Sequence, residues 1–103
     1  MRRQRRRGGD GRQREAAEAL AVAALSFLAE DGERLGGFLA ASGIGPERIR
    51  EAAREPGFLA GVLDHFSANE ALLIAFARHA GIDPAEVERA RAALGGGWER
   101  DLP

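Results

Sequence analysis

The stretch "FLAASGIGPERIREAA" at residues 38–53 returns as "FARHAGIDPAEVERAR" at residues 76–91, and the shift is 38 positions because 81 minus 43 is 38. Both copies carry a Phe, then Gly-Ile-x-Pro, then an Ile or Val three residues after the Pro. Glycine favours the left-handed conformation that ends many helices, and proline is favoured in the first turn of the next helix. The repeat therefore predicts two corners, each joining one helix to another.

A second interpretation of the first corner is a phosphate-binding turn, because Gly43-Ile44-Gly45 between two helices resembles a helix-hairpin-helix module that grips nucleic-acid backbone. The second copy argues against it, since Asp83 stands where the first copy has Gly45. An aspartate at that position caps a helix well but repels a phosphate. The capping interpretation covers both copies, so we expect the glycines to serve backbone geometry.

Apolar residues recur at helical spacing on both sides of the two corners, and nothing in the chain alternates like a strand. The pattern predicts an all-α protein, a compact bundle of five or six short helices. We expect helices over residues 14–30, from an Asp31 cap to Gly43, 46–54 with Ile49 and Ala53 buried, 58–66, from Ser67 to Gly81, and from Asp83 to the glycines at 95–97.

Two of these helices are expected to form a central hairpin, the one at Phe58 and the one at Leu72. The segment "SANE", residues 67–70, is typical of a capping box. In that motif the Ser hydroxyl and the Glu carboxylate each accept a hydrogen bond from a free amide at the helix start. We therefore expect Ser67 and Glu70 to open the fifth helix.

Charge divides the chain into a basic start and an acidic remainder. Residues 1–14 hold seven Arg and Asp10, which gives +6, whereas residues 15–103 hold eight Arg and fifteen acids, which gives −7. Residues 1–13 lack large apolar residues after Met1, so we predict a disordered basic tail, a helical domain over 14–95 and a flexible tail over 96–103 that carries Trp98. The arginines that could contact nucleic acid are Arg2, Arg3, Arg5, Arg6, Arg7, Arg12 and Arg14.

The sequence offers few groups for catalysis or metal binding. It has no Cys, and none of its serines lies in a Gly-x-Ser-x-Gly setting. His65 and His79 stand on successive predicted helices, at a spacing that matches no ligand motif. We therefore predict no catalytic residue, no cofactor and no metal site, and we interpret His65 as a partly exposed helix residue.

Several sequence clusters keep a fixed order: "ALSFLAED" at residues 24–31, "FLAGVLDHF" at 58–66 and "DPAEVERARAAL" at 83–94, with Phe38, Gly43 and Phe76 between them. In this order they resemble domain-of-unknown-function family 3572, a small, mostly alphaproteobacterial family of stand-alone helical proteins. The resemblance covers about residues 16–95. It implies a helical domain with no assigned activity, cofactor or binding site, and it implies no catalytic residues.

Two functions follow as hypotheses. The first is a non-enzymatic cytoplasmic interaction or adaptor module that binds an unknown protein partner, or a second copy of itself, through Ala-rich or Leu-rich faces not needed for the core. The alternative is a nucleic-acid-associated protein that uses the arginines of residues 2–14, with or without the Gly43–Gly45 corner. We expect no membrane role, because the apolar run at residues 19–29 is too short to span a bilayer.

Overall fold

The computed structural model describes residues 2–55 and 57–94, with side chains from residue 11 onward, and this part of the chain is helical without strands. The prediction of an all-α bundle is confirmed. The elements are α1 (Arg2–Ala29), α2 (Gly32–Ser42), the 3-10 helix η1 (Pro46–Arg48), α3 (Ile49–Ala52), α4 (Phe58–Ser67), α5 (Glu70–Ala80) and α6 (Pro84–Ala93).

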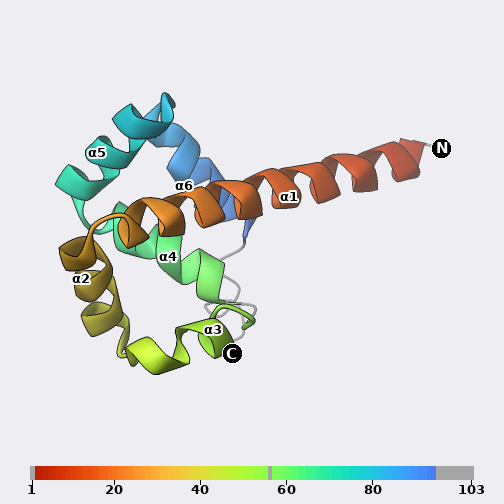
Figure 1. The fold of residues 1–103 in the computed structure, drawn as a ribbon. Helices are drawn as coiled ribbons and strands as arrows, with labels where there is room; N and C mark the ends of the chain where they lie inside the picture. The colour runs from red at the N-terminus through yellow and green to blue at the C-terminus, as the bar shows by residue number, and fades with distance from the viewer. Residues whose placement is uncertain (1, 56, 95–103) are drawn as a thin grey trace.

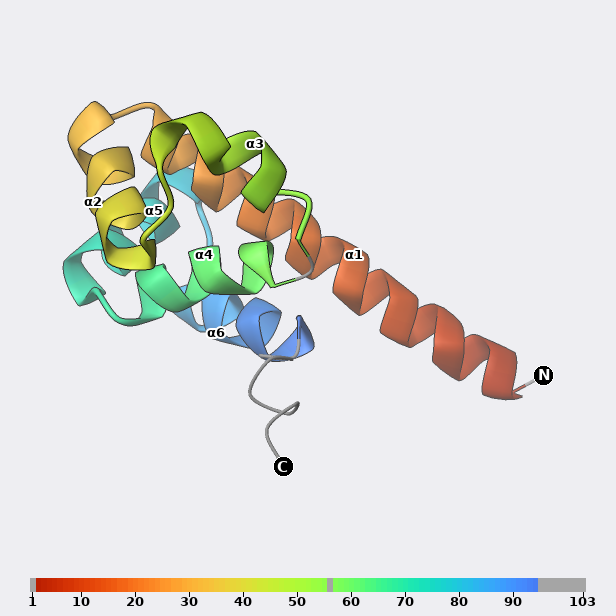
Figure 2. The same cartoon turned by 90° about the horizontal axis from the view of Figure 1, so that it is seen from below.

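Three helices form the centre of the bundle. The second half of α1 packs against both α4 and α6, which also pack against each other (Figures 1 and 2). Helix α2 packs on α1 and α4, and α5 packs on α4 and α6. The first half of α1 extends away from the rest of the bundle toward the N-terminus (Figures 1 and 2).

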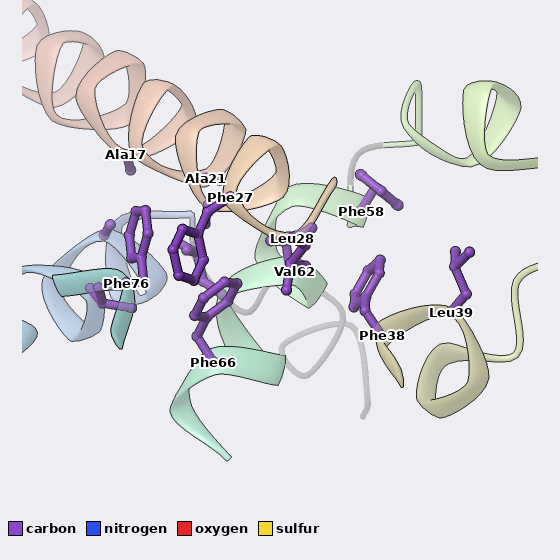
Figure 3. Close-up of a cluster of buried hydrophobic side chains, with 14 residues drawn as sticks. Ala17, Ala21, Phe27, Leu28, Phe38, Leu39, Phe58, Val62, Phe66 and Phe76 are labelled. Atoms are coloured by element: carbon purple, nitrogen blue, oxygen red, sulfur yellow. The ribbon is translucent and has the colours of Figure 1, made fainter. Parts of the chain in front are cut away.

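The core consists of large apolar side chains that these helices direct inward. Phe27 of α1, Phe66 of α4 and Phe76 of α5 meet with ring centroids 5.3–6.4 Å apart (Figure 3). Tilted ring pairs at such distances add stability beyond their buried area. The largest fully buried side chains are Phe66, Phe76, Leu28, Leu63, Val62 and Val87.

Alanines line the face of α1 that meets the core. Ala17, Ala21 and Ala24 are at most 3 % exposed, and Leu28 continues the same stripe one turn further. The steps of four, three and four residues keep these side chains on one helix face. Because alanine is small, this face lets neighbouring helices come close to α1, and the buried Ala90 of α6 belongs to the same cluster.

Both predicted corners are confirmed. Gly43 has φ +75° and Gly81 has φ +71°, which is the left-handed region in each case. The next residue closes the corner, as the N–H of Ile44 donates to the Leu39 carbonyl at 3.1 Å and that of Ile82 to the Ala77 carbonyl at 3.0 Å. Both isoleucines are half-buried against the core. At each corner the glycine therefore ends one helix, and the isoleucine packs against the core before the next helix begins.

The start of the next helix differs between the two corners. Asp83 caps α6, because its Oδ1 accepts a hydrogen bond from the Ala85 N–H at 2.8 Å. Gly45 occupies the N-cap position before η1 and has no side chain to do the same. The first corner accordingly leads into the short elements η1 and α3, where Ile49 is half-buried but Ala53, expected to be buried, is exposed.

The capping box at residues 67–70 is a wrong prediction. Ser67 is the last residue of α4, and its hydroxyl donates to Glu88 of α6 at 2.7 Å. Asn69 is the N-cap of α5 instead, accepting from the Leu72 N–H at 3.2 Å. Asn is as good an N-cap as Ser, and starting two residues later lets Ser67 complete α4.

The expected central hairpin also differs from the structure. Helices α4 and α5 are bent by 108° at their junction, so they form a corner rather than an antiparallel pair. The central position belongs to α4 together with α1 and α6. Residue spacing reports which face of a helix is buried but not the angle between two helices, which is why the sequence did not show this.

The structure draws α1 back to Arg2, through the segment expected to be a disordered tail, and the disorder of residues 1–13 stays a prediction. Extending an existing helix costs much less than nucleating one, and Arg and Gln are good helix formers. The packed residues from Ala17 onward provide the helix that residues 2–13 extend. The predicted flexible tail over 96–103, including Trp98, lies outside the described residues.

Candidate functional site

The candidate arginines all belong to α1. Arg12 and Arg14 are exposed, and Arg14 Nε lies 4.0 Å from Glu18 Oε2 one turn further on. Arg2, Arg3, Arg5, Arg6 and Arg7 belong to the part of the helix described by its backbone alone. This basic segment coincides with the part of α1 that extends beyond the bundle (Figure 1).

The Gly43–Gly45 corner opens onto a hollow of about 600 Å³ whose lining holds three carboxylates and one cation, Arg48. Glu47, Glu51 and Glu55 all line it. Glu47 folds back over the corner, since a Cβ built on Gly45 would lie 2.7 Å from its Oε2 atom. Three acids at the mouth of the turn repel a phosphate, so this geometry favours the capping interpretation of the corner.

The two histidines lie in separate aromatic settings. The ring of His65 is half-buried, 5.3 Å from the Phe38 ring and 6.3 Å from the Phe66 ring. Burial without a compensating charge lowers the pKa of His65 below its ordinary value. His79 is exposed at the end of α5, with its ring 5.0 Å from Phe27. Among residues 2–55 and 57–94, no three His, Asp or Glu side chains lie close enough together to hold a metal ion.

A polar cluster that the sequence did not reveal ties α4 to α6. The Nε–H of Arg91 donates to Oδ1 of Asp64, and its Nη1 lies 3.3 Å from Oε1 of Glu88. Glu88 in turn accepts the hydroxyl hydrogen of Ser67. All four side chains are thus linked across two helices, and these contacts give the cluster a structural role.

An open apolar groove of about 840 Å³ lies between α1 and α6. On one side it is lined by residues of α1, which are Ala16, Ala19, Leu20 and Ala23. On the other side it is lined by Ile82 from the second corner and by residues of α6, which are Ala90, Ala92 and Ala93. Polar side chains occur at its rim, where Gln13, Glu86 and Arg89 contribute.

The size and the apolar lining of the groove suit an apolar chain segment. Several of its alanines are exposed, including Ala16, Ala19, Ala23 and Ala92. Small side chains let the backbone of a bound segment come close, so larger apolar side chains of that segment would fill the space. The rim provides one carboxylate, one amide and one guanidinium for polar contacts. The sequence pointed to Ala-rich faces but could not pair α1 with α6, which lie at opposite ends of the described chain.

The length and the composition of the helices can be compared with what a membrane-spanning helix needs. Within the described ranges, no single helix has both the length and the apolar composition needed to cross a bilayer. Helices α4 and α5 taken together have that length and composition, but they are bent by 108° where they join.

Comparison with known proteins identifies a family but no function. Residues 14–97 match the model of a family described as protein of unknown function (DUF3572). No curated protein and no solved structure matched the chain. The matched residues run from the start of the packed half of α1 to just past the end of α6, and they exclude six of the seven candidate arginines. Since the match covers most of the 103 residues, the chain belongs to the DUF3572 family of proteins of unknown function.

Proposed function

We propose that this protein is a non-enzymatic protein–protein interaction module whose α1–α6 groove receives an apolar segment of a partner protein. The observation that carries the proposal is the groove itself, which remains open beside a well-packed core. Apolar grooves with polar rims are typical of sites that bind other chains. A cytoplasmic location is part of the same proposal, and a sequence without cysteine is compatible with it.

The lining of the groove defines the partner segment. Because its walls are mostly alanine, a partner would supply the large apolar side chains, as an amphipathic helix does with residues three and four positions apart. Arg89 forms no ion pair with the described residues, so an acidic side chain on the partner would complement it. The partner we expect is therefore an amphipathic segment with an acidic flank.

A non-enzymatic role is supported by what the reactive groups do. Ser67 bonds to Glu88, and Ser42 donates to the Phe38 carbonyl at 2.8 Å. His65 faces aromatic rings and does not line the groove. A nucleophile needs a base within hydrogen-bond reach, and neither serine has a histidine as its hydrogen-bond partner in these contacts.

Site-specific photo-crosslinking in the native cell tests the proposal. A photoreactive phenylalanine at Ala16 or Ala23 should cross-link to a defined protein, whereas the same group at the exposed Ala40 of α2 should not. The purified partner should then bind the wild-type chain and the Ala40→Glu control, and bind Ala16→Glu much more weakly by calorimetry. Equal cross-linking at all three positions, or none, would refute the groove as the binding site.

A second candidate function is nucleic-acid association through the basic half of α1. The observation that favours it is the concentration of positive charge on a helix that extends away from an acidic bundle (Figure 2). A variant with every arginine of residues 2–12 replaced by glutamine should lose salt-sensitive binding to duplex DNA or RNA. If the wild-type chain shows no such binding in anisotropy titrations at low salt, this candidate is rejected.

A further inference from the structure

We propose that the C-terminal segment of this same chain, residues 95–103, occupies the α1–α6 groove with Trp98 as its anchor. The consequence for regulation rests on the proposed function: a partner segment would have to displace the tail before it could bind. Three features favour this occupant: the place where α6 ends, the reach of the tail and the chemistry of its residues.

The last helix of the described chain ends at the edge of the groove. Helix α6 ends at Ala93, and Ala92 and Ala93 both line the groove. From Ala93 to Trp98 the chain can reach about 17 Å at its extended spacing. The α1 wall from Ala16 to Ala23 is about 10 Å long at the helical rise. Three glycines, residues 95–97, let the chain reverse without steric cost, so Trp98 can reach the groove.

The chemistry of the tail matches that of the groove. Trp98 is the only tryptophan and a large apolar side chain, and the alanine walls leave room for it. A buried indole needs an acceptor for its N–H, and Gln13 and Glu86 place such oxygens at the rim. Glu99 follows Trp98 directly, and Arg89 at the rim has no ion-pair partner among the described residues.

Connection through a short linker favours the tail over a second copy of the chain. A segment joined to its site by a short glycine-rich linker is present there at a millimolar effective concentration. A second copy would compete at its bulk concentration, which is far lower in dilute solution. Occupancy of the groove by the tail should therefore be independent of protein concentration.

Fluorescence of the single tryptophan tests this inference on the full chain. The emission maximum of the folded protein should lie at shorter wavelength than that of the urea-unfolded chain, and acrylamide should quench it less. Ala16→Glu and Ala23→Glu should move both quantities to the values of the unfolded chain. Ala40→Glu should leave both unchanged. All three sites are exposed, so circular dichroism and the thermal midpoint should show that each variant is folded.

Three results would overturn the inference. The first is an emission maximum in the folded wild type equal to that of the unfolded chain. The second is protection of Trp98 from acrylamide that survives both groove substitutions. The third is protection of Trp98 that is lost on dilution, which would indicate a second copy. The first result leaves the proposed function intact if Ala16 still cross-links to a partner. Conversely, a protected Trp98 in a chain that cross-links to no partner would reject the proposed function alone. If both are correct, Trp98→Ala should increase cross-linking at Ala16.

Discussion

Arg91 of α6 and Asp64 of α4 form an ion pair that joins two central helices distant in sequence. Both side chains are partly exposed, so water screens their attraction. The hydrogen bond between them and the further contact of Arg91 with Glu88 nevertheless hold the pair in one geometry. This pair adds a polar contact to the apolar packing of α4 against α6.

Removing the carboxylate should weaken the domain modestly. Asp64→Ala is expected to lower the free energy of unfolding by about 1 kcal/mol, in the range of well-oriented, partly exposed ion pairs. Urea denaturation at low and high salt measures this. The matched control is Glu51→Ala, which removes an exposed pair with Arg48 at 3.9 Å and should have almost no effect. Equal losses in both variants would contradict the assigned role of Asp64.

Leu28 should contribute far more to stability than an exposed apolar residue on the same helix. Leu28 is fully buried, whereas Val22 is 51 % exposed. Leu28→Ala opens a cavity and is expected to cost about 2–5 kcal/mol. Val22→Ala should change the free energy of unfolding by only about 0.5 kcal/mol or less. Chemical denaturation of both variants compares them directly, and similar midpoints would show that the described face of α1 is not the buried one.

Replacing glycine by alanine should change stability in opposite directions at Gly81 and at Gly36. Gly81 lies in the left-handed region, whereas a Cβ added at Gly36 in α2 would meet nothing within 4 Å. Gly81→Ala should therefore cost roughly 1–2 kcal/mol. Gly36→Ala should raise stability by about 0.5–1 kcal/mol through better helix propensity. Thermal midpoints are sufficient to determine both signs, and a stabilised Gly81→Ala variant would show that the corner does not have this conformation.

The free energy of unfolding should decrease as the pH is lowered and His65 becomes protonated. Burial lowers the pKa of His65 in the folded state, so the unfolded chain takes up the proton first. The stabilising contribution is complete above the unfolded pKa of about 6.5 and is lost as the pH falls toward the lower folded value. Urea titrations of wild type and His65→Gln from about pH 8 to pH 5 should show a smaller loss in the variant. Parallel pH profiles would refute this.

Much of the local structure could be predicted from residue types alone. Gly43, Gly81 and Asp83 specify helix ends through backbone conformation and short-range hydrogen bonds, which depend on neighbours in sequence. The buried positions of α4 followed from their spacing in the same way. Where two local signals competed, as Ser67 and Asn69 did, sequence could not decide between them, because the choice depended on Glu88 in another helix.

The candidate site could not be predicted in the same way. The α1–α6 groove exists only once the alanines of two distant helices face each other, and an alanine face looks the same in sequence whether it is packed or open. The pairing of Arg91 with Asp64 likewise depends on how α4 and α6 align. Both features are set by packing between helices, which periodicity does not encode.

The packing of α1 against α6 has a consequence for biosynthesis. Helix α1 leaves the ribosome long before α6. The alanine face of α1 therefore stays uncovered until α6 has been synthesised and packs against it. Contacts between distant parts of a chain form slowly because a long loop must close first. The nascent domain therefore stays incomplete until translation has passed Ala93, and a chain stalled before that point exposes α1 to chaperones and proteases.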